Sequence, residues 1–254
     1  MSEQYDPDNL LDRLSDPDTL NAHYGHLRER EREILRRRFP RAGGDVLAVG
    51  CGRDPGRHLF PAPAWRMTGV ELEEEWPRAL VASGELDAGC AGRAGELDEL
   101  ADGSFDVVLY RYVLHHVVYQ GPLDPVFGEA ARLLRPGGAL VAIEPGALHP
   151  VGAALTAANG LGLGPAVHGT PDDVPLTAGR LEREARAAGL DPRVDAVTYG
   201  WRRLPPPVQR ALWSLDGALG SRPRAARLGH TLMLVARKPV LLAVDGRGDA
   251  GRGR

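Results

Sequence analysis

Short apolar segments that alternate with helical segments are the feature that most restricts how this chain can fold. A short apolar run closed by a turn residue is typical of a strand buried on both faces of a parallel sheet. Such runs occupy residues 45–50, 67–71, 88–94, 105–110 and 139–144. Helical patterns at 73–83 and 124–135 separate them, so the sequence predicts βαβ units in a doubly wound α/β fold.

The pattern changes after residue 144. Residues 145–177 are rich in Gly, Ala and Pro and have no clear period, so we interpret them as a cap insertion with a short helix near 153–158. The remaining predicted elements are helices at 178–188 and 207–219 and strands at 193–199 and 230–236.

The chain is expected to form one domain with additions at its ends. Residues 1–40 have helical spacing and a charged helix that ends before Pro40, which suggests an N-terminal helical lid. Residues 41–240 form the predicted core with the cap inserted. The Gly- and Arg-rich residues 241–254 are expected to be a disordered tail.

Composition excludes several classes of function. No apolar run approaches the roughly 20 residues of a membrane span, and the acidic start lacks a secretion signal, so a cytoplasmic protein is expected. The net charge is −3 and arginines alternate with acids, which argues against nucleic acid as a partner. The two cysteines fit neither a disulfide framework nor a zinc site, and the only lysine, Lys238, excludes a GK[ST] phosphate loop.

A glycine turn closes the first predicted strand. Gly50 and Gly52 allow a tight bend and close approach of backbone N–H groups to a ligand. Glu71 follows at the end of the second strand, where a carboxylate can accept hydrogen bonds from both ribose hydroxyls. These two features also fit a nicotinamide dinucleotide fold, although GxGxxG would require glycine where Pro55 stands.

Five motifs that follow one another along the chain distinguish the nicotinamide dinucleotide fold from another fold family. They are Gly50-Cys51-Gly52, Gly69-Val70-Glu71, Ser104-Phe105-Asp106-Val107-Val108, Val113-Leu114-His115-His116 and Leu134-Arg135-Pro136-Gly137-Gly138. Together they resemble the landmarks of class I S-adenosylmethionine-dependent methyltransferases of the small-molecule, "type 11" kind. The resemblance covers about residues 44–145. It implies a Rossmann-like, mostly parallel seven-stranded sheet with an antiparallel last strand, and S-adenosyl-L-methionine as cofactor.

The same resemblance implies a set of cofactor-binding residues. The turn at 50–52 corresponds to the bend beneath the methionine part of the cofactor, Glu71 to the ribose-binding acid, and the segment 95–100 to the region that meets adenine. Tyr110 and Arg111 would flank the sulfonium and the substrate opening. The full set is Val49, Gly50, Cys51, Gly52, Asp54, Glu71, Leu72, Glu96, Leu97, Tyr110 and Arg111.

Two positions depart from the family pattern. The family usually has an acid where Ala48 stands and a third glycine where Asp54 stands. Asp54 could supply the missing charge, or it could mark a loop that binds the cofactor weakly; our hypothesis is that cofactor binding is retained. A protein that keeps the fold but has lost the chemistry is the alternative that these positions leave open.

Methyl transfer to oxygen or nitrogen also needs a group that removes a proton. A free imidazole has a pKa of about 6.5, so His116 and His115, after the fourth strand, are candidate bases. Glu144, at the end of the fifth strand, is a third candidate base of similar standing, and His149 and His168 are weaker candidates. No third ligand stands near the paired histidines at a metal-binding spacing, so no metal is expected.

The sequence therefore predicts methyl transfer to an oxygen or nitrogen of a small organic molecule, possibly a secondary metabolite. Substrate recognition is expected from the N-terminal helices and the cap, with Tyr24, Tyr119 and Trp201 as possible rim aromatics. We expect a monomer or homodimer that contacts neither membrane nor nucleic acid. An NAD(P)-dependent oxidoreductase and an inactive cofactor-binding or regulatory protein are the rival interpretations.

Overall fold

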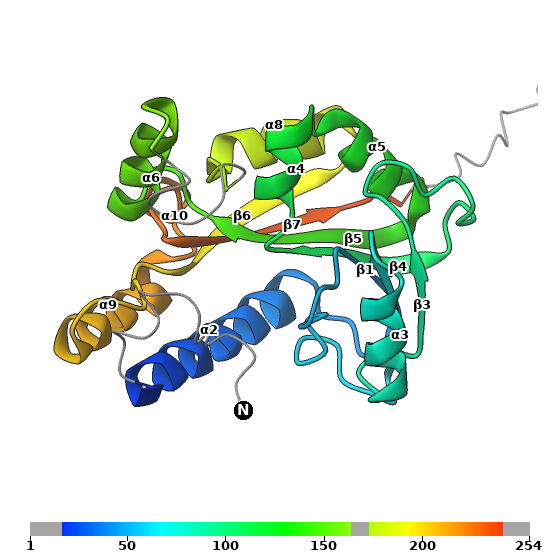
Figure 1. Cartoon of the computed structure of the whole chain (residues 1–254), viewed down its shortest axis with the longest axis horizontal. Helices are drawn as coiled ribbons and strands as arrows, with labels where there is room; N and C mark the ends of the chain where they lie inside the picture. The colour runs from blue at the N-terminus through cyan, green and yellow to red at the C-terminus, as the bar shows by residue number, and fades with distance from the viewer. Residues whose placement is uncertain (1–16, 164–172, 241–254) are drawn as a thin grey trace, which may run out of the picture.

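The computed structural model describes residues 17–163 and 173–240, which form a seven-stranded sheet between two layers of helices (Figure 1). The strand order is β3-β2-β1-β4-β5-β7-β6. The strands are β1 (Gly44–Val49), β2 (Trp65–Glu71), β3 (Ala88–Ala91), β4 (Phe105–Arg111), β5 (Leu134–Pro145), β6 (Asp191–Thr198) and β7 (Thr231–Arg237).

Strand direction follows the sequence prediction. β1 pairs in parallel with β2 and β4, β2 with β3, and β4 with β5. β7 runs antiparallel to both of its neighbours, β5 and β6. The predicted doubly wound, mostly parallel sheet with an antiparallel last strand is confirmed.

Helices cover both faces of the sheet. α4, α5 and α8 lie over one face, and α2, α3 and α9 over the other (Figure 1). The bounds are α2 (Pro17–Arg38), α3 (Glu75–Ala82), α4 (Leu114–Gln120), α5 (Asp124–Leu133), α6 (Pro150–Gly160), α8 (Ala178–Ala187), α9 (Pro206–Leu219) and α10 (Pro223–Ala226). The short helices α4 and α10 were not expected from the sequence.

The central strands are buried on both faces, which explains their continuous apolar runs. Val108 and Leu140 pack in the cluster that includes α5 and α8 residues. The alternate residues Val107 and Val141 pack in the cluster that includes α2 residues. Every side chain of β4 before Arg111 is buried, so the strand leaves little freedom in where its last residues point.

The described part of the predicted N-terminal lid is α2, which forms part of the core. Leu27 and Ile34 join the apolar cluster beneath the sheet, and Arg37 and Arg38 donate to the fully buried Asp195 of β6 at 2.8 and 2.7 Å.

Within the predicted cap, α6 contains the expected short helix. Hydrogen bonds of 2.9 Å, donated by the backbone N–H groups of Ala147 and Leu176, join the two ends of the cap. The structure describes no residue of 1–16, 164–172 or 241–254. The expectations for His168 and for the C-terminal tail therefore lie outside the described residues.

Candidate functional site

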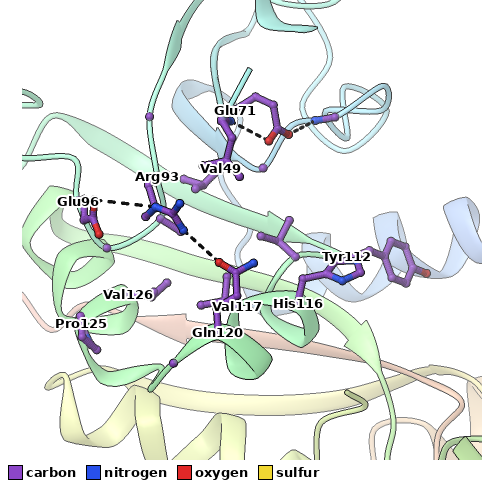
Figure 2. Close-up of a pocket in the computed structure, with 18 of the residues that line it drawn as sticks. Val49, Glu71, Arg93, Glu96, Tyr112, His116, Val117, Gln120, Pro125 and Val126 are labelled. Carbon is purple, nitrogen blue, oxygen red and sulfur yellow. Dashed lines mark hydrogen bonds and ion pairs between the residues drawn. The ribbon is translucent and has the colours of Figure 1, made fainter. Parts of the chain in front are cut away.

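A cavity of about 580 Å³ opens at the carboxyl ends of β1, β2, β3 and β4 (Figure 2). β1 and β4 are the neighbours at which the strand order reverses, and ligands of open α/β sheets bind at this point. The lining residues are Val49, Gly50, Gly52, Glu71, Leu72, Gly92, Arg93, Ala94, Gly95, Glu96, Tyr112, Val113, His116, Val117, Gln120, Gly121, Pro122, Pro125 and Val126. Its volume falls in the usual range for a small-molecule or cofactor site.

The loop after β1 requires glycine. Gly50 and Gly52 adopt φ values of +66° and +46°, a region that residues with a side chain rarely occupy. A Cβ on Gly50 would also lie 2.6 Å from a methyl group of Val113. A Cβ on Gly52 would meet no atom within 4 Å. The bend thus packs tightly on one side while Gly52 borders open space.

The Glu71 carboxylate contacts this loop from the end of β2. Its Oε2 accepts from the Gly52 N–H and its Oε1 from its neighbour Leu72 N–H, both at 2.9 Å (Figure 2). An ionised carboxylate offers about four acceptor positions. Two are used by these N–H groups, so the remaining ones can serve a pair of hydroxyls on a ligand. The exposed fraction of Leu72 is 56%, which leaves an apolar side chain at the cavity wall for a ligand to cover.

The loop after β3 forms another wall. Glu129 of α5 accepts hydrogen bonds from the N–H groups of Gly95, at 2.8 Å, and Leu97, and so fixes the loop. Arg93 donates to Gln120 Oε1 at 3.0 Å and lies 4.0 Å from the Glu96 carboxylate (Figure 2). The Arg93–Gln120 bond connects the β3 loop to α4.

Six of the eleven predicted cofactor residues line this cavity: Val49, Gly50, Gly52, Glu71, Leu72 and Glu96. The other five lie outside its lining: Cys51, Asp54, Leu97, Tyr110 and Arg111. The sequence analysis had linked Glu71 to the glycine bend by spacing alone, and the structure places the two in direct contact.

Tyr110 and Arg111 lie away from the predicted opening because β4 is covered on both faces. The Tyr110 ring is fully buried in the core, and its hydroxyl donates to the Val126 carbonyl at 3.4 Å. Arg111 pairs with Asp54 at 2.9 Å and lies 3.6 Å from Glu31 of α2.

Asp54 does not provide the cavity with a carboxylate in place of Ala48. Its side chain accepts from the Gly56 N–H at 3.1 Å and binds Arg111. Burial alone would raise the pKa of Asp54, but Arg111, that N–H, His58 and Arg28 together hold the pKa below its usual value. Ala48 itself is buried within β1. The charge at position 54 therefore stabilises the loop from outside the cavity.

Cys51 and Leu97 also point into the core. Burial, followed by the charge of Glu71, raises the pKa of the Cys51 thiol to about 12. Leu97 is 5% exposed and packs with the residues beneath α5. Both residues shape the cavity from behind without forming its surface.

The three candidate bases occupy different environments. Only His116 lines the cavity. Glu144 is fully buried and accepts from the backbone N–H groups of Val113 and Leu114 at 3.0 and 2.8 Å, so it caps the start of α4. The buried His115 ring joins Glu144 through Nδ1 at 2.7 Å. His115 and Glu144 thus anchor the helix that carries His116.

His149 also caps the start of a helix. Its Nδ1 accepts from the Val151 N–H at the start of α6. Within the described residues, no group of three or more His, Cys, Asp or Glu side chains is arranged to hold a metal ion. No helix in residues 17–163 or 173–240 is long and apolar enough to cross a bilayer.

Sequence reasoning missed more than half of the cavity wall. Arg93, Gln120 and Tyr112 carried no recognised motif, because α4 was not predicted and Arg93 was treated as part of a strand. Tyr112 adopts φ +58°, which is unusual for a residue with a side chain and occurs often at functional sites. Its position directly after β4 was the one available signal.

The fold and cavity define the class: a doubly wound α/β protein with a cavity of small-molecule size at the carboxyl ends of its central parallel strands. Residues 47–142 match the family model for a methyltransferase domain. A probable S-adenosylmethionine-dependent methyltransferase of Mycolicibacterium smegmatis is 32% identical over 126 residues, covering 46% of this chain and 44% of the relative. The nocamycin O-methyltransferase of Saccharothrix syringae is 37% identical over 109 residues, covering 39% and 37%.

Solved structures agree on the fold. The crystal structure of a possible histamine N-methyltransferase from Thermotoga maritima superposes with a TM-score of 0.58 at 16% identity, covering 87% of this chain and 91% of that one. These comparisons support a class I S-adenosylmethionine-dependent methyltransferase domain over residues 47–142 of this chain. Its alignments span less than half the length of the curated relatives.

Proposed function

We propose that this protein transfers a methyl group from S-adenosylmethionine to an oxygen or nitrogen of a small organic molecule. The observation that carries the proposal is the Glu71 carboxylate, held 2.9 Å from the Gly52 N–H at the rim of a cofactor-sized cavity. The similarity to the nocamycin O-methyltransferase of Saccharothrix syringae supports a small acceptor.

The residues around the cavity fit the cofactor. Glu71 has acceptor positions left for the ribose hydroxyls, and Leu72 offers an apolar surface beside them. Of the residues that line the cavity, Gly50 and Gly52 would hold the methionine part of the cofactor, and Glu96 and Arg93 would contact its adenine. When bound, the cofactor supplies a methyl group on a positively charged sulfur.

The chain's own task is to align the acceptor and to take up its proton. We assign proton acceptance to His116, because it is the one residue of the three candidate bases in the cavity wall. Glu144 and His115 are positioning residues, since they fix the first turn of α4.

Mass spectrometry tests the activity. The protein is incubated with S-adenosylmethionine and a panel of small oxygen and nitrogen nucleophiles, and a product that has gained one methyl group is expected. Calorimetry with S-adenosylhomocysteine runs in parallel. Absence of cofactor binding contradicts the proposal, and binding with no methylated product across the panel favours the inactive cofactor-binding protein. A fluorescence titration with NADH should show no binding, because binding would favour the oxidoreductase.

His116→Asn tests the base with the acceptor found in that panel. We expect kcat to fall about 100-fold or more, while the affinity for S-adenosylhomocysteine stays within about threefold. Glu74→Gln, at an exposed residue outside the cavity lining, is the control and should behave as wild type. An unchanged kcat in His116→Asn would remove His116 from this role.

A further inference from the structure

Polar side chains outside the cavity contact the glycine loop from its far side. We call them the loop brace, which consists of Arg28 and Glu31 of α2, Asp54 and His58 of the loop, and Arg111 at the end of β4. None of these five residues lines the cavity, whereas the same loop supplies Gly50 and Gly52 to the cavity wall. The brace therefore lies behind the part of the loop that a ligand would touch.

Arg111 is the centre of the loop brace. Its guanidinium donates to Asp54 at 2.9 Å and lies 3.6 Å from Glu31, so it joins the loop to α2. The stem of the same side chain lies against Gly56, which has φ +80°. A Cβ on Gly56 would lie 3.5 Å from Arg111 Cδ and 2.9 Å from a methyl group of Leu109. Arg111 thus contacts both a charge and the backbone of the loop.

α2 contacts the loop at further points. Glu31 lies 2.7 Å from His58 Nε2, and Arg28 lies 3.6 Å from the Asp54 carboxylate. Arg32 donates to the His58 carbonyl at 3.2 Å. Positions 28, 31 and 32 share one face of the helix, because residues three and four apart are neighbours on an α-helix. This face of α2 therefore contacts both ends of the segment 54–58.

The charges of the loop brace are buried. Glu31 is fully buried, and the Arg111 side chain is 7% exposed. Burial alone would lower the pKa of Arg111, but Glu31 and Asp54 raise the pKa above its usual value, so the guanidinium stays charged. Pairing offsets the desolvation of buried charges only in part, so such a network is weak evidence for stability. Its best-supported use is to fix the register of the segments that it joins.

The glycine loop needs contacts that select its conformation. Glycine has more accessible backbone conformations than any other residue, so a glycine loop loses more conformational freedom when it is ordered. On the cavity side, the Gly52 N–H donates to Glu71 at 2.9 Å. On the far side, the Gly56 N–H donates to Asp54 at 3.1 Å, and Asp54 is itself held by Arg111. The loop is therefore fixed from both sides.

We propose that the loop brace holds the glycine loop in the conformation that binds S-adenosylmethionine, so that Glu31, Asp54 and Arg111 are positioning residues for the cofactor. The inference rests on the proposed function, because it concerns the affinity of the same site. It assigns a role in cofactor binding to α2, which lies on the face of the sheet opposite α4 (Figure 1). When only a fraction of molecules holds the binding conformation, the apparent dissociation constant rises by the inverse of that fraction.

Calorimetry with S-adenosylhomocysteine tests the proposal on variants of the Asp54–Arg111 pair. Asp54→Asn and Arg111→Gln should each weaken binding at least about tenfold, because each removes the charged contact that holds the loop. The double variant should bind about as weakly as Arg111→Gln alone, since both changes break the same pair. Wild-type affinity in both single variants would overturn the inference, and so would losses that add in the double variant.

Asp195→Asn is the matched control. Asp195 is also a fully buried acid that accepts from α2, through Arg37 and Arg38, but it belongs to β6 at the other edge of the sheet. This variant should lower the midpoint of thermal unfolding and keep the affinity for S-adenosylhomocysteine within about threefold of wild type. If it weakens binding as much as Asp54→Asn does, affinity follows stability and the inference fails.

Hydrogen exchange of the ligand-free protein, followed by mass spectrometry, separates positioning from direct contact with the cofactor. Peptides that cover residues 50–58 should exchange faster in Asp54→Asn than in wild type, while peptides of β5 should not change. Weaker binding with unchanged exchange of the loop would contradict a positioning role.

The two proposals fail in different measurements. If the wild-type protein does not bind S-adenosylhomocysteine, the proposed function fails, and the exchange experiment still tests the brace because it needs no ligand. Thermal unfolding shows whether each variant is folded. If Arg111→Gln does not fold, Asp54→Asn decides, because the Asp54 side chain is 17% exposed and asparagine can still accept the Gly56 N–H.

Discussion

Replacing Glu71 with alanine is the sharpest test of the cofactor site. The carboxylate holds the Gly52 and Leu72 N–H groups at 2.9 Å and has acceptor positions left for two ribose hydroxyls. A hydrogen bond to a charged group contributes about 1.5–3 kcal/mol, so loss of the pair should cost roughly 3 kcal/mol or more. We therefore expect Glu71→Ala to weaken binding of S-adenosylhomocysteine at least about 100-fold.

Isothermal titration calorimetry measures this loss, and thermal unfolding checks the fold. Glu71→Gln should also weaken binding, because both carboxylate oxygens face N–H donors and the amide NH₂ must oppose one of them. Glu74→Ala is the matched control, since Glu74 is exposed and its carboxylate pairs with Arg78 of α3 at 3.0 Å, outside the cavity lining. A dissociation constant for Glu71→Ala within about threefold of wild type would refute the assignment of the ribose site.

Three further changes test the framework of the site. Gly50→Ala should lower the free energy of unfolding by more than about 1 kcal/mol, measured in urea, because φ is +66° and a Cβ would lie 2.6 Å from Val113; an unchanged midpoint would contradict this. Glu144→Gln should cost about 2–3 kcal/mol in the same assay, since the amide cannot accept from both the backbone and His115, and wild-type stability would show that the cap is dispensable. Burial lowers the pKa of His23 from 6.5 to about 4, so between these pH values the native state binds fewer protons than the unfolded state. The free energy of unfolding should therefore fall as the pH drops from 6.5 toward 4, and it should fall less in His23→Asn. The same pH dependence in wild type and His23→Asn would refute this role of His23.

Much of the fold follows from local sequence. Apolar runs such as 45–50 and 105–110 are buried on both faces, so their hydrophobicity alone marks them as strands. α4 was missed because it is seven residues long and its start is fixed by Glu144, a residue 30 positions from the Leu114 N–H that it caps. No local pattern records such a contact.

The sequence by itself determined the βαβ order, the glycine bend at 50–52 and the acid at the end of β2, because each depends on residues close together in the chain. Tertiary structure decided which neighbours face the cavity. His116 reaches it whereas His115 turns toward Glu144, and Tyr110 enters the core whereas Tyr112 forms the wall. Neighbouring side chains point in different directions here because the direction of a side chain at the end of a strand depends on what packs against it. These packing partners come from distant segments of the chain.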